Sequence, residues 1–198
     1  MSEIKYRIEK DSLGEVEVPS DALYGAQTVR AMNNFQITGR PVNDMMYISL
    51  AQVKKACALA NLQVDELDQV RCDAIVEACD EIITGKFKDD FVTDAIQGGA
   101  GTSINMNVNE IISNRAAQLL NKPIGVYDFI HPNDHVNKAQ STNDIIPTAG
   151  KLTVLNLGKL LLDEMELLAG TFHKKALEFA PIIKVGRTHL QDAVLISM

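Results

Sequence analysis

The stretch that decides the fold is NDIIPTAGKLTVLNLGKLLLDEMELLAGTFHKKALEF, which runs from Asn143 to Phe179. Apolar residues occur almost all the way round its helical projection, whereas a helix at the surface of a globular domain carries a single apolar stripe. A helix of this kind packs on several sides at once, as the helices of a bundle do. The sequence therefore predicts one long helix inside a helical bundle.

Shorter elements are predicted before this helix. Asp44 and Asp68 can each cap a helix, and the second helix stops at Gly85. A further helix begins after the glycines at 98, 99 and 101 and ends near 121–123. Alternation over 15–18 predicts a short strand or hairpin arm. The predicted fold class is mainly α, with an N-terminal helical domain and short β arm over 1–140 and the start of a central helical bundle over 141–198.

Composition excludes several classes of protein. The chain has 198 residues, with 19 Lys and Arg against 26 Asp and Glu and no Trp, which disfavours a nucleic-acid partner. No uninterrupted apolar run approaches the roughly 18 residues of a membrane span, and the start does not resemble a secretory signal. We therefore expect a soluble cytoplasmic protein. Cys57, Cys72 and Cys79 lack CxxC spacing, which predicts reduced core thiols rather than metal ligands.

Asparagine is concentrated where charge is sparse. Residues 91–150 hold eight of the thirteen asparagines but only eight of the 45 charged residues. Neutral donors without like-sign charge suit a pocket that orients a small anion. Surface loops rich in turn formers have the same composition, so both interpretations stay open.

Three segments carry residues suited to chemistry. The first, QGGAGTS at 97–103, places Thr102 and Ser103 at a helix start, where N–H groups favour anions. It lacks the lysine of a P-loop, and Ile104 replaces the last glycine of a Rossmann fingerprint, so a phosphate-binding module is disfavoured. A glycine turn followed by an ordinary helix cap is the simpler alternative.

The second segment, HPNDHVNKAQSTND at 131–144, opens the long helix with Ser141, Thr142 and Asn143, which can meet an anion or simply cap the helix. A zinc site at His131 and His135 is disfavoured, because Pro132 interrupts the helical face that such spacing needs. The third segment, GRTHLQD at 186–192, adds Thr188 and His189. A lone histidine is more often structural than catalytic.

Together, in this order and spacing, the three segments resemble the aspartase/fumarase superfamily. The resemblance extends from about Arg7 and includes ALYGAQTVR at 22–30. GGAGTS at 98–103 and QSTND at 140–144 resemble its aspartate ammonia-lyase branch. Fumarases of the family tend to have a TGSGT-type glycine segment and a second serine at the position of Thr142, so Gly99, Ala100, Ser103 and Thr142 discriminate the two branches.

The resemblance implies a function. Members of this branch deaminate L-aspartate reversibly to fumarate and ammonia, without an organic cofactor, through an aci-carboxylate intermediate. Thr102, Ser141 and Thr142 would hold the side-chain carboxylate, and Asn143 the amino group. Thr188 and His189 would position the α-carboxylate and amine end, with His189 in a binding role. The implied partner is a small dicarboxylate, and the implied assembly is a homotetramer whose sites draw residues from three subunits.

The resemblance also implies a serine base on a GSS-x-MP-x-K-x-N loop, which the 198 residues do not contain, and Leu195 stands where the family has a proline. We therefore expect an N-terminal portion of a longer lyase that is inactive alone and has no catalytic residue of its own before Met198. The alternatives are a class II fumarase and a non-catalytic remnant that self-associates through the long helix.

Overall fold

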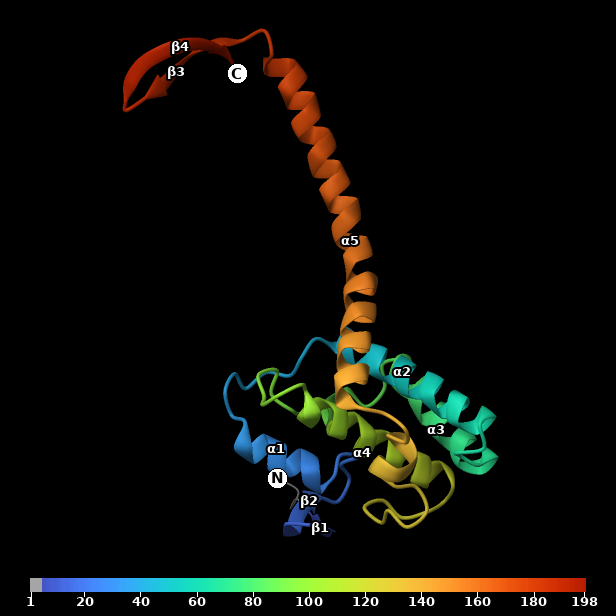
Figure 1. Ribbon diagram of the computed structural model, residues 1–198. Coiled ribbons are helices and arrows are strands. Elements are labelled where there is room, and N and C mark those ends of the chain that lie inside the picture. Colours follow the sequence, from blue (N-terminus) through green and yellow to red (C-terminus); the bar gives the residue numbers. More distant parts are fainter. Residues whose placement is uncertain (1–4) are drawn as a thin grey trace. The chain divides into compact units, whose positions relative to one another are not determined.

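The computed structural model describes residues 5–198 (Figure 1). Helices predominate, and the strands form two separate hairpins. In chain order the elements are β1 (Tyr6–Asp11), β2 (Gly14–Pro19), α1 (Ala26–Asn34), α2 (Asp44–Gln63), α3 (Gln69–Ile83), the 3-10 turn η1 (Lys88–Asp90), α4 (Thr102–Leu119), the π-helical turn η2 (Pro132–Val136), α5 (Thr142–Phe179), β3 (Ile183–Thr188) and β4 (Gln191–Ser197). The mainly α fold class is confirmed.

The chain divides into two compact units, Met1–Val154 and Leu155–Met198. The division falls within α5, whose first turns belong to the first unit. The predicted domains, 1–140 and 141–198, rest on the family's organisation rather than on compactness and stay a prediction.

The predicted β arm is an antiparallel hairpin, in which Tyr6 of β1 lies opposite Pro19 of β2. The side chain of Arg7 fixes this hairpin to the chain that follows it. Its guanidinium donates hydrogen bonds to the carbonyl oxygens of Pro19, Ala22 and Tyr24 at 2.7–2.8 Å. The arm is therefore part of the first unit's folded body.

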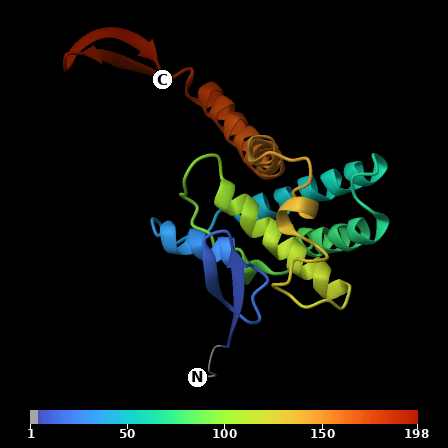
Figure 2. The same cartoon turned by 60° about the horizontal axis from the view of Figure 1, so that its bottom comes forward.

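Helices α2 and α3 lie side by side, with α4 packed along α3 (Figure 2). Asp68 caps α3 as predicted, accepting a hydrogen bond from the Arg71 N–H at 3.0 Å. The prediction that Asp44 caps α2 was wrong by one residue. Asn43 is the cap, because its backbone is still extended and its side chain accepts the Met45 N–H at 2.9 Å, whereas Asp44 is already helical.

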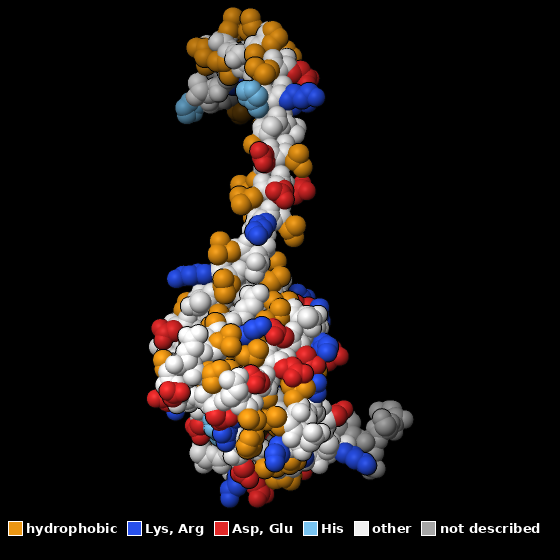
Figure 3. All heavy atoms as spheres, turned by 90° about the vertical axis from the view of Figure 1, so that its right-hand side faces the viewer, with side chains coloured by type: hydrophobic (Ala, Val, Ile, Leu, Met, Phe, Trp, Pro, Cys, Tyr) orange, Lys and Arg blue, Asp and Glu red, His pale blue; other side chains and the backbone are white. Residues whose placement is uncertain are grey.

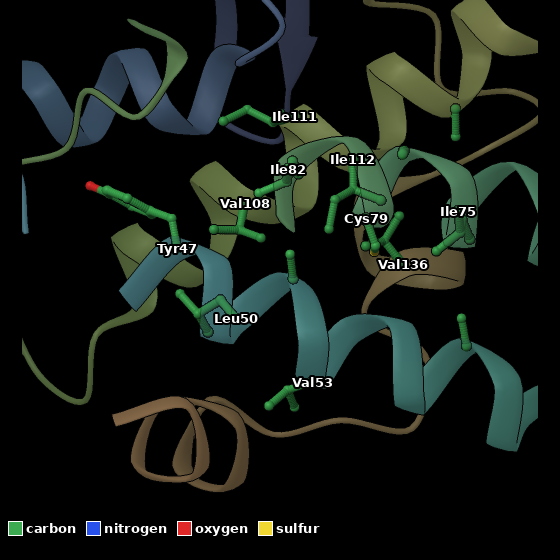
Figure 4. Packing of buried hydrophobic residues seen from close by; sticks show 14 of the residues in the cluster. Tyr47, Leu50, Val53, Ile75, Cys79, Ile82, Val108, Ile111, Ile112 and Val136 are labelled. Carbon is green, nitrogen blue, oxygen red and sulfur yellow. The ribbon is translucent and has the colours of Figure 1, made fainter. Parts of the chain in front are cut away.

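The core lies between these three helices and η2 (Figure 4). Leu50 of α2, Ile75 of α3 and Val108 of α4 are all fully buried and belong to one contiguous cluster. Cys72 and Cys79 are buried free thiols in the same cluster, which confirms their predicted core role. Burial raises the pKa of the Cys79 thiol.

Two buried carboxylates cap the start of α1. Glu110 of α4 accepts hydrogen bonds from the N–H groups of Gly25, Gln27 and Thr28 and from the Thr28 hydroxyl at 2.6–3.1 Å. Glu9 of β1 accepts the Ala26 N–H at 2.9 Å. These bonds satisfy the N–H groups that the first turn of a helix leaves free. Burial raises the pKa of the Glu110 carboxyl.

Helix α5 confirms the predicted long helix, with 38 residues. Only Ile145 and Ala149 of these are buried in this chain. Its leucine side chains beyond Val154 are exposed, and apolar side chains recur along the helix in Figure 3. By length and composition α5 could also cross a membrane, because its most apolar window has a mean hydropathy of 1.3, although the core helix of a soluble bundle passes the same test.

The hairpin of β3 and β4 was missed in the sequence. The register of β3 and β4 shifts at Gly186: Val185 lies opposite Leu195, whereas Arg187 lies opposite Asp192. Its two-residue turn is His189 and Leu190, both with positive φ, 51° and 62°. Such turns usually carry Asn or Gly, so the ordinary sequence signal for a hairpin is absent here.

Candidate functional site

The first predicted segment forms the N-terminus of α4, and Thr102 is its first helical residue. The backbone reaches this point through Gly101 in the left-handed region, with φ at 85°. Gln97 accepts the Ile104 N–H at 2.8 Å. Within residues 5–198, the N–H groups of Thr102 and Ser103 have no acceptor. The Thr102 side chain is exposed, so this helix start can receive an anion.

The second segment forms the N-terminus of α5. The Ser141 hydroxyl accepts a hydrogen bond from the Asn143 N–H at 3.2 Å, and the Ser141 carbonyl accepts from Asp144 and Ile145 at 3.0 and 3.1 Å. Ser141 is thus the capping residue, rather than Thr142 or Asn143. The side chains of Ser141 and Asn143 are exposed and that of Thr142 is half-buried, so all three reach the surface.

These two helix starts touch each other. A Cβ atom at Gly101 would lie only 3.1–3.2 Å from three carbon atoms of Ile146, in the second turn of α5. The absence of a side chain at 101 therefore allows α4 and α5 to approach, in addition to permitting the positive φ. As a result, Thr102 and the segment 141–143 come from neighbouring helix N-termini, whose dipoles both favour negative charge.

A cleft of about 390 Å³ lies beside the start of α4 and is lined by Ser103, Gln27, Arg30 and Asn34, among others. The Arg30 guanidinium is paired with Asp11 at 2.7 Å. This pair raises the pKa of Arg30 and lowers the pKa of Asp11. Arg30 is thus already neutralised by a partner.

Thr188 and His189 lie in the second unit, at the end of β3 and in the turn of the hairpin. Both side chains are exposed. The structure therefore places four of the six predicted residues, Thr102, Ser141, Thr142 and Asn143, at two helix starts that contact each other through Gly101 and Ile146, and carries the other two on a separate unit.

Four of the eight asparagines in the window 91–150 lie in the protein interior. Asn105, Asn107, Asn109 and Asn114 all lie in α4 with exposed fractions of 0–2%. Asn107 and Asn114 donate to the carbonyl oxygens of Asp90 and Leu23 at 3.0 and 2.8 Å. The surface-loop interpretation was therefore wrong for these four residues, which hold loops against a central helix.

A buried lysine on α2 was not predicted from the sequence. Lys54 of α2 is fully buried and donates hydrogen bonds to the side-chain oxygens of Asn137 and Gln140 at 2.7 and 2.8 Å. Burial lowers its pKa to about 7. The signal was present, because Lys54 shares a helical face with Leu50 and Ala58, where an apolar residue is expected.

The two histidines of the second segment accept hydrogen bonds from backbone N–H groups. His131 Nδ1 accepts hydrogen bonds from the Asn133 and Asp134 N–H groups at 3.2 Å, and His135 Nδ1 accepts the His131 N–H at 2.8 Å. These contacts cap the turn η2. Within residues 5–198, no group of three potential metal ligands occurs.

The chain is similar in sequence and in structure to known proteins. A family described as lyase matches residues 14–198. An aspartate ammonia-lyase of a Bacillus species is 55% identical over 188 residues, which are 95% of this chain and 40% of that protein. A class II fumarate hydratase of Campylobacter jejuni is 44% identical over 98% of this chain and 42% of its own length.

Among solved structures, a fumarate lyase:delta crystallin from Brucella melitensis has a TM-score of 0.89 and 48% identity, covering 98% of this chain and 43% of its own. The chain thus belongs to the lyase family known as the aspartase/fumarase superfamily. Within that family, several of the most similar relatives are aspartate ammonia-lyases. The chain spans about two fifths of the length of these curated relatives.

Proposed function

We propose that this chain is part of an aspartate ammonia-lyase, which converts L-aspartate reversibly to fumarate and ammonia. One observation carries the proposal: the N-terminus of α4 and the N-terminus of α5 meet at Gly101 and Ile146. Both ends present hydroxyl groups, and neither brings a positive side chain of its own. Such a surface suits a carboxylate whose charge increases during the reaction.

The chemistry explains why these donors matter. Removal of the proton beside the side-chain carboxylate of aspartate leaves an aci-carboxylate with two negative charges, and the amine departs afterwards. Donors that are fixed in advance where charge develops lower the barrier most. In this proposal Thr102, Ser141 and Thr142 donate to that carboxylate, and Asn143 binds the amino group.

The remaining roles fall outside the first unit. We assign Thr188 and His189 to the α-carboxylate and amine end of the substrate. The proton-abstracting serine belongs to a loop type that residues 1–198 do not contain. The 198-residue chain alone is therefore expected to bind poorly and to turn over no aspartate.

The test is the rate at which fumarate absorbance appears with L-aspartate or with L-malate as substrate. It uses a protein with the length of the curated relatives that contains this chain, with the 198-residue chain as the control. Turnover of aspartate by the long protein alone supports the proposal. Turnover of malate instead contradicts it, as does fumarate formation by the 198-residue chain.

A class II fumarase is the second candidate, because the fumarate hydratase of Campylobacter jejuni is 44% identical. Ala100, Ser103 and Thr142 favour the ammonia-lyase, whereas a TGSGT-type segment aligned at Thr102 keeps the glycine at 99. Exchange toward the fumarase pattern, with Ala100→Ser and Thr142→Ser, should move activity from aspartate toward malate if these residues set the reaction.

We also propose a homotetramer in the cytoplasm that forms through α5. Exposed leucines along α5, such as Leu155, Leu160 and Leu168, are 55–71% accessible in the single chain. Packing against copies of the same helix would remove this apolar surface from water. Sedimentation in buffer tests the homotetramer, which a monomeric protein would contradict. Cell fractionation tests the location, and recovery of the protein with membranes would contradict the cytoplasmic assignment.

A further inference from the structure

The buried ammonium of Lys54 is bonded to the chain directly ahead of the proposed carboxylate site. Its Nζ donates to Asn137 Oδ1 at 2.7 Å and to Gln140 Oε1 at 2.8 Å. Gln140 immediately precedes Ser141. Lys54 therefore connects the middle of α2 to the segment from which Ser141, Thr142 and Asn143 emerge.

The same acceptor joins this segment to α4. Asn137 Oδ1 also accepts from the side-chain amides of Asn105 and Asn109 at 3.1 and 3.3 Å. Gln140 in turn donates from its side chain to the Val136 carbonyl at 2.9 Å. A single oxygen atom thus gathers donors from α2 and from the second and third turns of α4, the helix that begins with Thr102.

A lysine is an expensive choice for a purely structural position. Burial of an ammonium group without a carboxylate disfavours its charged form, and a methionine would fill similar space without that cost. The titratable groups that face Lys54 are the thiols of Cys57 on its own helix and Cys79 on α3. Asn137, Gln140, Asn105 and Asn109 contribute neutral amides, and Lys138 is paired with Glu66 at 3.0 Å.

We propose that Lys54 is a positioning residue for the anion site, which holds the segment 137–143 in place so that Ser141, Thr142 and Asn143 face Thr102. The inference rests on the proposed function, because that function supplies the substrate that Ser141, Thr142 and Asn143 would bind. Lys54 itself touches no substrate in this scheme. Its hydrogen bonds set the position at which α5 begins relative to α4.

Amide hydrogen exchange on the 198-residue chain tests the geometry without any substrate. Lys54→Met should lower the protection factors of the Asn143, Asp144 and Ile145 amides at least tenfold. The amides of α3 from Cys72 to Ile82 should stay within twofold, because they depend on the apolar core. Unchanged protection at 143–145, or an equal loss in α3, would overturn the proposal.

Lys55→Met is the matched control. Lys55 is the next residue of α2, but its ammonium lies at the surface and pairs with Asp80 at 2.7 Å. This variant also removes one lysine, so it corrects for net charge. Its exchange at 143–145 should equal that of the unmodified chain, and a loss comparable to that of Lys54→Met would overturn the assignment.

Kinetics on the longer protein provide the functional measurement. Lys54→Met should raise the KM for aspartate at least tenfold and lower kcat as well, because misplaced donors weaken both ground-state and transition-state binding. Lys55→Met should change neither. A Lys54→Met enzyme with unchanged KM and kcat would overturn the inference. Failure of the unmodified protein to use aspartate would overturn only the proposed substrate. In that case the hydrogen-exchange measurement would decide the positioning role of Lys54.

Discussion

Helix α4 carries four buried asparagines and a buried glutamate, whereas the far more apolar α5 buries only Ile145 and Ala149 of its 38 residues. Hydropathy alone would have predicted that α5 is the more buried of the two helices. Loops supply partners to donor groups of α4, as Ile130 does in accepting the Ser113 hydroxyl at 2.7 Å. The buried Oδ1 atoms of Asn105, Asn107 and Asn109 have no hydrogen-bond partner within the described residues. The leucines of α5 beyond Val154 have no comparable cover within the described residues.

The difference teaches that burial follows the availability of partners rather than polarity. The side-chain amides of the four α4 asparagines all donate hydrogen bonds, which offsets part of the cost of their burial, whereas an apolar group remains exposed when nothing packs on it. Helix α4 is thus covered by its own chain, whereas α5 is a surface that a partner can cover.

The largest expected effect comes from removing the buried carboxylate of α4. Glu110→Ala would leave three backbone N–H groups and the Thr28 hydroxyl without their acceptor. We expect the free energy of unfolding to fall by about 3–5 kcal/mol. Urea denaturation of the 198-residue chain measures it. Glu77→Ala on the exposed face of α3 is the control. A loss below about 1 kcal/mol for Glu110→Ala would show that the start of α1 does not depend on this carboxylate.

The second effect concerns the two helix starts. Thr102→Ala or Ser141→Ala, in a protein with the length of the relatives, should lower aspartate turnover by about 10²-fold, as loss of other oxyanion donors does. Thr84→Ala, at the exposed end of α3, should leave turnover within twofold. Near-normal rates in both site variants would remove Thr102 and Ser141 from the site.

A third effect appears in the pH dependence of stability. The folded pKa of Lys54, about 7, lies below its ordinary value of 10.5, so above pH 7 the unfolded chain binds the extra proton. The contribution of Lys54 to the free energy of unfolding should therefore rise between pH 7 and pH 10.5, by up to about 1.4 kcal/mol per pH unit. Burial raises the pKa of the Cys72 and Cys79 thiols, which act in the opposite sense.

The measurement is thus the difference between the unmodified chain and Lys54→Met in urea denaturation at pH 7.5, 8.5 and 9.5, because the cysteines are common to both. The difference should increase with pH in favour of the unmodified chain. A constant difference would show that Lys54 keeps an ordinary pKa in the folded state.

A fourth, smaller effect tests the surface of α5. Leu160→Asp should weaken self-association of the chain at least tenfold in sedimentation experiments, since a charge would enter an apolar contact. Leu13→Asp is a matched control, because Leu13 is equally exposed, 77% against 71% for Leu160, but lies in the turn between β1 and β2. Equal effects of the two substitutions would contradict an interface on α5.

Periodicity predicted the helices well. The glycines before Thr102, the Asp68 cap and the apolar run after Asn143 are local signals, and α3, α4 and α5 begin where these signals stand. The three motifs led to the correct family. Two features depended instead on contacts distant in sequence. Lys54 meets Asn137 across 83 residues, and Gly101 meets Ile146 through packing, so neither contact is encoded in any short segment.

The smallest effect separates the first turns of α5 from the remainder. Thr153 and Thr171 both return a hydroxyl hydrogen bond to the carbonyl four residues earlier, at 2.8 and 2.9 Å. Thr153 alone also reaches the Ser49 hydroxyl of α2, at 2.9 Å. Thr153→Val should therefore cost about 0.5–1.5 kcal/mol of unfolding free energy, and Thr171→Val close to nothing. Equal losses of unfolding free energy in urea denaturation would show that the contact of Thr153 with α2 contributes nothing. The first turns of α5 would then be no better packed in the folded chain than the remainder of the helix.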